Sequence, residues 1–316
     1  MLKNTRFKIY TFFLFIFFTV LFLEILVRII VDNGKNLSLE MMKYAKDYKI
    51  ISQDKKIGIE HRKNISGKLM GVKVNLNSNG LRNNFEIKED TRKVLMIGDS
   101  MTFGWGAQKP FSKILNELLG DKYQILNAGI GNTNTKMQIN NFFKNYSEID
   151  IETIVINFFI NDLEEVKIEP YNIIQKHFYI YTFINTSFHE VLIRLGFKPN
   201  WKAFYRNTFK NEKILNETFN EILKLKKFCM NNDIKLIINN IPELKDLKNY
   251  KFIKETEIIS TFAENNGIKF INSYQILKNY DEKLLWVTNK DLHANDFAHS
   301  LIGEYLHMSL FNESDS

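Results

Sequence analysis

The chain has 316 residues, of which 45% are hydrophobic, and this is enough apolar material for one sizeable domain with accessory segments. Its net charge of +7 arises from cations scattered among acidic residues, without a basic stripe or nucleic-acid motif, so we expect no nucleic-acid partner and some attraction to membrane surfaces. A lone cysteine, Cys229, excludes an internal disulfide, and the lack of Cys/His clusters and phosphate-binding glycine motifs predicts neither a metal site nor a cofactor.

The N-terminal residues resemble a membrane segment in composition. Residues 9–23 carry no charge, follow three cations, and their apolar character continues to Val31. A helix over 9–31 would be about 34 Å long, enough to cross a bilayer. Glu24 and Arg28 are i,i+4 neighbours that can pair near one end of it. A cleavable signal peptide is the alternative, but no Ala-x-Ala-like site comes after the run, which favours an uncleaved signal-anchor.

The charges around this segment predict how the chain is placed. Three cations ahead of the apolar run favour a cytoplasmic tail at 1–8 and export of the rest of the chain, to the periplasm or the outer surface of a cytoplasmic membrane. Residues 32–71 are polar and rich in Lys and Asn, and we expect a stalk there. The folded domain is expected at 72–316. Near its start, Asn79-Gly80 predicts a hairpin or a tight turn, and the next cation, Arg82, either braces the active edge or lies on the surface.

From residue 92 onward, strand-like runs alternate with helix-like ones. Such alternation predicts a parallel sheet that is covered by helices on both faces. The aromatic-rich segment 164–206 interrupts the rhythm and is either an insertion over the cleft or a small satellite core. Strands are expected at 93–97, 123–127, 152–158, 234–240 and 267–271, and helices at 110–119, 134–145, 211–231, 252–265 and 296–311.

Short polar blocks lie where these strands end or where the last helix begins. The carboxyl ends of parallel strands meet at one edge of a sheet, where open α/β sheets bind ligands. The blocks should therefore gather there. They are Gly98-Asp99-Ser100, Asn127-Ala128-Gly129-Ile130-Gly131, Ile160-Asn161-Asp162 and Asp291-Leu292-His293.

The order of these blocks, Ser, Gly, Asn and Asp-His, resembles that of the SGNH hydrolases, also called GDSL esterases, over about residues 94–299. The resemblance implies a three-layer α/β/α, flavodoxin-like fold and acyl transfer. It implies Ser100 as nucleophile and His293 as general base. It further implies an oxyanion hole made by the Ser100 and Gly129 backbone N–H groups and the Asn161 amide.

The third triad member departs from the family spacing. The usual Asp-x-x-His would place the acid at position 290, where this chain has Lys290. We therefore expect Asp291 to orient His293, and the alternative is that Asp291 only caps the helix that starts near Ala294. Phe103, Trp105 and Phe159 are expected in the cleft, with Phe159 standing where many relatives have glycine.

The implied substrate is an ester on an acylated glycan or a lipid, and a carbohydrate O-acetyl group is preferred. An O-acetyltransferase that works with a membrane acyltransferase partner would need the same residues. A lysophospholipase or thioesterase is a further alternative. A catalytically silent binding module is the alternative that Lys290 keeps open.

Overall fold

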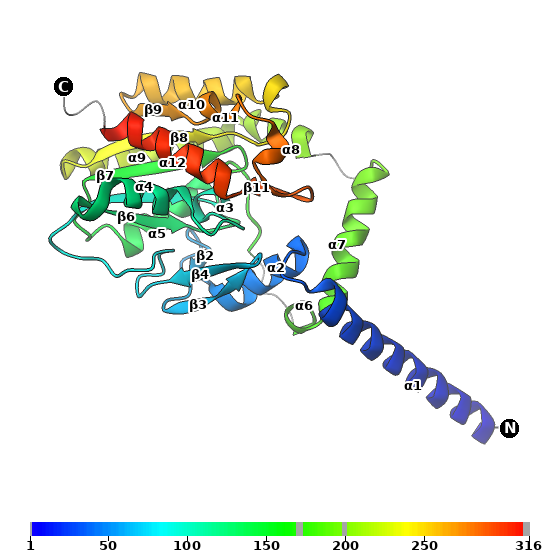
Figure 1. The fold of residues 1–316 in the computed structure, drawn as a ribbon. Helices are drawn as coiled ribbons and strands as arrows, with labels where there is room; N and C mark the ends of the chain where they lie inside the picture. Colours follow the sequence, from blue (N-terminus) through cyan, green and yellow to red (C-terminus); the bar gives the residue numbers. More distant parts are fainter. Residues whose placement is uncertain (1, 169–172, 198–200, 312–316) are drawn as a thin grey trace.

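A computed structural model describes residues 2–168, 173–197 and 201–311 (Figure 1). Its centre is a five-stranded, all-parallel sheet with the strand order β6-β5-β7-β8-β9. This is the 2-1-3-4-5 order of flavodoxin-like folds, as predicted. The strands agree with the predicted ones within two residues at either end. They are β5 (Arg92–Gly98), β6 (Tyr123–Gly129), β7 (Thr153–Phe159), β8 (Lys235–Ile241) and β9 (Lys269–Asn272).

Helices cover both faces of this sheet, which explains why its strands are almost continuously apolar and buried (Figure 1). On one face α4 (Phe111–Leu119) packs against α12 (Asp296–Phe311), and on the other α5 (Thr135–Asn145) packs against α9 (Glu212–Asn231). Helix α10 (Ile253–Asn265) lies beside β9. All five helices were predicted to within one residue. Cys229 lies on the buried face of α9, as expected.

Short elements complete the domain around the sheet. Two of them matter for the site, namely α3 (Ser100–Phe103) and the hairpin of β10 (Trp286–Thr288) and β11 (Asp291–Ala294). The others are α11 (Tyr274–Leu277) and the 3₁₀ turns Gly120–Lys122, Leu247–Asn249 and Glu282–Leu284.

Residues 32–71 do not form the expected stalk. They fold into α2 (Leu37–Lys43), a π-helical turn (Tyr44–Tyr48) and the paired strands β1 (Lys49–Ile51) and β2 (Ile59–His61), and then into β3 (Ile65–Leu69), which pairs with β4 (Val72–Leu76). The reason is a second hydrophobic cluster. Buried side chains scattered through this polar segment pack against the domain, and the cluster contains Tyr44, Tyr48, Leu69, Met70, Phe103 and Trp105. Residues 32–71, which we call the N-terminal extension, therefore belong to the domain.

The predicted turn at Asn79-Gly80 is a tight turn and not a hairpin loop. Gly80 has a φ of 77° and its N–H donates to the carbonyl of Asn77 at 3.0 Å. The hairpin of β3 and β4 turns instead at Met70-Gly71, where both residues have positive φ.

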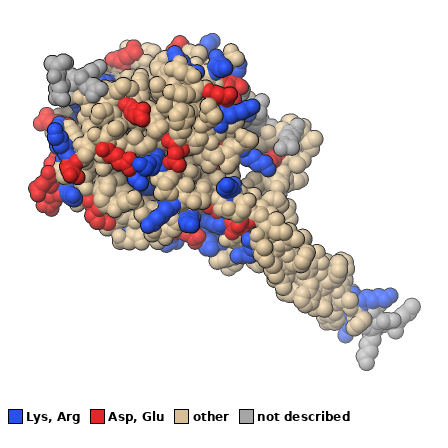
Figure 2. All heavy atoms as spheres, viewed as in Figure 1, with Lys and Arg blue, Asp and Glu red and all other residues tan. Residues whose placement is uncertain are grey.

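Helix α1 (Leu2–Leu26) projects from the domain and continues as a π-helical turn to Val31 (Figure 1). Residues 5–31 are long and apolar enough to cross a membrane, a property that signal sequences share. Figure 2 shows that charged side chains gather at the far end of α1 and leave most of its length without charge.

The predicted pair of Glu24 and Arg28 is present, with 2.7 Å between Glu24 Oε1 and Arg28 Nε. Glu24 also accepts the backbone N–H groups of Tyr179 and Ile180, at 3.1 and 2.9 Å, in the first turn of α7 (Tyr179–Arg194). A carboxylate on these N–H groups caps α7, so the end of α1 is joined to that helix.

The segment 164–206 covers the cleft less than expected. Its helices are α6 (Ile173–His177), α7 and the start of α8 (Trp201–Phe209), and residues 169–172 and 198–200 lie outside the described part. Helix α7 packs against α2 and the end of α1 (Figure 1), and none of its described residues lines the cleft. The cleft is instead bounded by α2 and the π-helical turn.

Candidate active site

Ser100 lies at the point where the strand order of the sheet reverses. It comes directly after β5, which has β6 on one side and β7 on the other, and this switch point is where flavodoxin-like sheets bind ligands. The chain turns sharply there, and a Cβ on Gly98 would lie 2.0 Å from Thr102 Oγ1, so position 98 requires glycine. The Asp99 carboxylate accepts the N–H of Met101 at 2.8 Å and so starts α3.

Ser100, His293 and Asp291 form one chain of hydrogen bonds. His293 Nε2 lies 2.9 Å from Ser100 Oγ, and His293 Nδ1 lies 2.6 Å from Asp291 Oδ1. Because an ionised carboxylate only accepts, the proton is on Nδ1, which leaves Nε2 free to accept from the serine hydroxyl. This is the arrangement that a general base needs in order to activate a serine.

Asp291 is fixed by more than the imidazole. Its Oδ1 also accepts the backbone N–H of His293 at 3.2 Å, and its Oδ2 accepts the indole N–H of Trp105 at 2.9 Å. The alternative role as a helix cap is filled by Asn295, whose Oδ1 accepts the N–H of Ala298 at 3.0 Å in α12. Lys290 is exposed in the hairpin turn before β11.

The electrostatics of the pair favour proton transfer from serine to histidine. Burial opposes the charged imidazolium, but the hydrogen bond and negative charge of Asp291 outweigh it and raise the pKa of His293 above its ordinary value. Burial alone would raise the pKa of Asp291, yet the bonds from His293 and Trp105 hold that pKa below its usual range. The carboxylate is therefore ionised at neutral pH, where it stabilises the protonated base.

The oxyanion side of the site differs from the prediction at one residue. Gly129 is the last residue of β6, and its N–H donates to Asn127 Oδ1 at 3.0 Å. A Cβ there would lie 2.2 Å from the backbone nitrogen of Phe103, so position 129 requires glycine for packing. The Gly129 prediction is wrong because β6 continues two residues beyond the expected end. Gly131 and Asn132 line the cleft with Ser100 instead, and Asn132 is exposed with a φ of 61°.

Asn161 comes after β7 and lines the same cleft, as expected for an amide donor. Burial raises the pKa of the Asp99 carboxylate, although the Asn161 side chain opposes the shift. Asp162 accepts the backbone N–H of Phe159 and the Gln138 amide, both at 3.0 Å, and burial together with the charge of Asp99 raises its pKa well above the ordinary value. Asp99 and Asp162 thus hold the loops in place.

The N-terminal extension holds the loop after β6 from both sides. The Gly131 N–H donates to the hydroxyl of Tyr44 at 3.0 Å, and Lys49 Nζ donates to the Gly131 carbonyl at 2.5 Å. Tyr44 in turn lies 2.6 Å from His61 Nε2, while His61 Nδ1 lies 3.1 Å from the Gly80 carbonyl. Because that carbonyl only accepts, Nδ1 carries the proton and Tyr44 donates to Nε2. Burial lowers the pKa of His61 to about 3, so it stays neutral.

Arg82 braces the segment after α3, one of the two roles expected for it. Its guanidinium is buried and donates to the carbonyls of Phe103, Gly104 and Ala107, and it lies 4.7 Å from the centre of the Phe103 ring. Tyr44, Lys49 and His61 were missed, because each is a single residue in a polar segment and no local motif marks it.

The cleft around Ser100 has a volume of about 490 Å³. Trp105 and Phe159 line it, as expected, and Tyr205 is the contribution of segment 164–206. Phe103 does not line it, because its ring is 1% exposed and packs beneath Tyr44 and Trp105 in the second cluster. In the described parts of the chain, no group of three or more His, Cys, Asp or Glu is placed to hold a metal ion.

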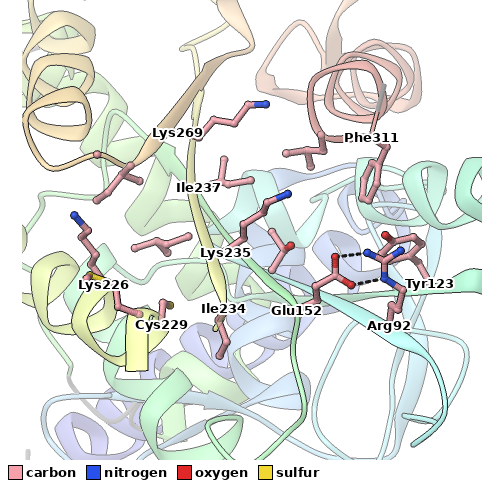
Figure 3. Close-up of a pocket in the computed structure, with 16 residues that line it drawn as sticks. Arg92, Tyr123, Glu152, Lys226, Cys229, Ile234, Lys235, Ile237, Lys269 and Phe311 are labelled. Atoms are coloured by element: carbon pink, nitrogen blue, oxygen red, sulfur yellow. Dashed lines mark hydrogen bonds and ion pairs between the residues drawn. The ribbon is translucent and has the colours of Figure 1, made fainter. Parts of the chain in front are cut away.

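A hollow of about 640 Å³ lies at the opposite edge of the sheet, near the amino ends of the strands (Figure 3). Arg92 and Glu152 pair there, and Lys235 and Lys269 begin β8 and β9. It contains none of the predicted site residues.

No protein-family model matches this sequence, and no curated protein matches it. Solved structures do. The chain is similar to an acetylxylan esterase from Geobacillus stearothermophilus, at 12% identity and a TM-score of 0.46, over 71% of this chain and 97% of that one. It is similar to a lipolytic G-D-S-L family protein from Veillonella parvula (13%, 0.44, 70% and 99%). It is also similar to a GDSL-like lipase from Bacteroides thetaiotaomicron (15%, 0.41, 72% and 93%).

Proposed function

We propose that this protein is an SGNH-type serine esterase. The observation that carries the proposal is the hydrogen-bonded chain from Ser100 Oγ through His293 to Asp291 at the mouth of the cleft. A serine hydroxyl that meets only a helix turn would need neither an imidazole at 2.9 Å nor a buried carboxylate behind it.

In the proposed mechanism, His293 Nε2 takes the proton of Ser100 as its oxygen attacks the ester carbonyl. The oxyanion is stabilised by the Ser100 N–H, by the Asn161 amide and by the Asn132 backbone N–H, since the Gly131 N–H is bonded to Tyr44. His293 then gives its proton to the leaving alcohol, which yields an acyl-enzyme. Water, deprotonated by the same imidazole, attacks this intermediate and releases the acid together with free Ser100.

The proposed substrate is an O-acetyl group on a carbohydrate. The cleft walls support this choice, since Trp105, Tyr205 and Phe159 offer aromatic surface, while Glu243 and Asn132 offer polar atoms for sugar hydroxyls. We further propose that residues 5–31 anchor the chain in a cytoplasmic membrane as a single span with the cytoplasmic end at 1–8, so that the domain is exported.

A fluorophosphonate probe tests the nucleophile directly. The full chain in detergent micelles should gain the mass of one probe, and Ser100→Ala should gain none. His293→Ala should label far more slowly, and its thermal unfolding reports whether it is folded. Lack of labelling in folded wild-type protein would contradict the proposal. Acetate release with and without a glycan acceptor then separates hydrolysis from transfer.

A further inference from the structure

A second hollow lies beside the cleft. It has a volume of about 470 Å³ and lies between the N-terminal extension and the start of segment 164–206. Three residues line both spaces, namely Ala45, Lys49 and Asn132. The two spaces are therefore neighbours, and a substrate whose ester lies at Ser100 would have to pass Lys49 and Asn132 to reach the second one.

The described lining of the hollow carries an excess of positive charge. Among the twelve lining residues that belong to the described part of the chain, five are Lys or Arg and none is Asp or Glu, whereas Lys and Arg are 43 of the 316 residues of the whole sequence. A carboxylate outside the lining, Asp47, lies 3.7 Å from Lys46. Within the described part of the chain, no ion pair engages the other four cations. We call these five residues the cation subsite, and they are Lys46, Lys49, Arg62, Lys167 and Lys176.

Lys49 lies at the junction of the two spaces. Its ammonium donates to the Gly131 carbonyl and lies 4.1 Å from the centre of the Tyr44 ring. Burial lowers the pKa of Lys49 to about 7, so near neutral pH it is only partly charged. An anion beside it would restore the full charge.

Like charges that converge on one concave surface repel one another, and a bound anion removes the repulsion. Here the five cations line a space of ligand size beside the cleft that holds Ser100.

We infer that the cation subsite binds an anionic group, a phosphate or a carboxylate, carried by the alcohol portion of the ester substrate. The inference rests on the proposed function, because it assigns a substrate class to the same site. Both an acidic glycan and an anionic lipid headgroup carry this chemistry, and hydrolysis of matched esters distinguishes them.

Binding is measured first, apart from catalysis. The full chain with Ser100→Ala is titrated in neutral detergent with glycerol 3-phosphate and with glycerol. We expect binding of the phosphate alone, and a loss of at least about tenfold in affinity when Lys46→Gln and Arg62→Gln are added. The matched control is Lys63→Gln with Lys68→Gln, which removes the same charge from exposed positions outside the hollow. Equal affinities of the two double variants, or no phosphate binding by the parent, would overturn the inference.

Catalysis then identifies the source of the anion. The wild-type chain should hydrolyse acetylated glycerol 3-phosphate at least about tenfold faster, in kcat/KM, than acetylated glycerol, and Lys46→Gln/Arg62→Gln should remove that preference. The same comparison is made with O-acetylated glucuronic acid and with an anionic lysophospholipid. The substrate whose kcat/KM falls more in Lys46→Gln/Arg62→Gln identifies the source of the anion as a glycan or a lipid. Equal kcat/KM for charged and neutral esters refutes the cation subsite. Phosphate binding without hydrolysis or probe labelling at Ser100 refutes the proposed function alone.

Discussion

Replacing Asp291 by asparagine separates the charge of this residue from its shape. The carboxylate accepts three N–H groups, two at Oδ1 from His293 and one at Oδ2 from Trp105. The asparagine amide has one oxygen. With that oxygen at the Oδ1 position, the amide keeps both bonds from His293. Its NH₂ group then faces the indole N–H of Trp105, which is left without an acceptor. The proton on His293 then stays on Nδ1, so the base keeps its orientation but loses its negative partner.

The size of the effect can be worked out from these bonds. A hydrogen bond to a charged group is worth about 1 to 2 kcal/mol more than a neutral one, and a buried donor without an acceptor costs about 1 to 3 kcal/mol. We take about 1 to 2 kcal/mol of the cost of the unpaired Trp105 N–H to raise the activation free energy. Together with the lost charge, Asp291→Asn then loses about 2 to 4 kcal/mol of transition-state stabilisation, or roughly 30- to 900-fold in kcat/KM. Adding Trp105→Phe removes the unpaired donor, so the double variant should recover about 5- to 30-fold.

The assay is hydrolysis of 4-nitrophenyl acetate by the full chain in detergent, with thermal unfolding of each variant alongside. Lys290→Ala is the control at the position where the family spacing would place the acid, and it should leave kcat/KM unchanged. An unaltered rate in Asp291→Asn, or a double variant slower than the product of the two single effects, would refute this account of Asp291.

Three further outcomes are expected. A base is active when neutral, so kcat/KM should rise with pH through a midpoint above 6.5, the ordinary value for His293, because Asp291 raises its pKa; a midpoint at or below 6.5 contradicts this. Asn161→Ala should lower kcat by about 100- to 1000-fold with little change in KM, and a change confined to KM would remove this amide from the oxyanion site. Tyr44→Phe should destabilise the protein by about 1 to 3 kcal/mol, because the buried Gly131 N–H loses its acceptor; thermal unfolding checks this, and an unchanged midpoint argues against that bond.

The sequence predicts the sheet and its helices closely, because buried parallel strands are short apolar runs and the helices have clear limits. It also predicts which residues meet at the carboxyl edge, since the strands fix where Ser100 and Asn161 lie. The position of Gly129 could not be judged in the same way. Because β6 continues two residues further, that N–H is bonded to the Asn127 side chain, and the loop that lines the cleft carries Gly131 instead.

The contribution of the N-terminal extension could not be predicted at all. Tyr44 and Lys49 meet Gly131 across 87 and 82 residues, and neither residue type carries a local signal for such a contact. The segment is polar on average, and average polarity hides the few aromatic side chains that fasten it to the domain.

The joint between Glu24 and the first turn of α7 has a consequence for the range over which the protein can act. A flexible linker of about 40 residues would place the domain at a root-mean-square distance of about 35 Å from its anchor. Here the extension is folded onto the domain, and the end of α1 is fastened to α7 through the Tyr179 and Ile180 N–H groups. Under the proposed anchoring, the mouth of the cleft stays at one height above the bilayer. Turnover then depends on how densely esters are presented at that height, and polymer further from the surface is beyond its reach.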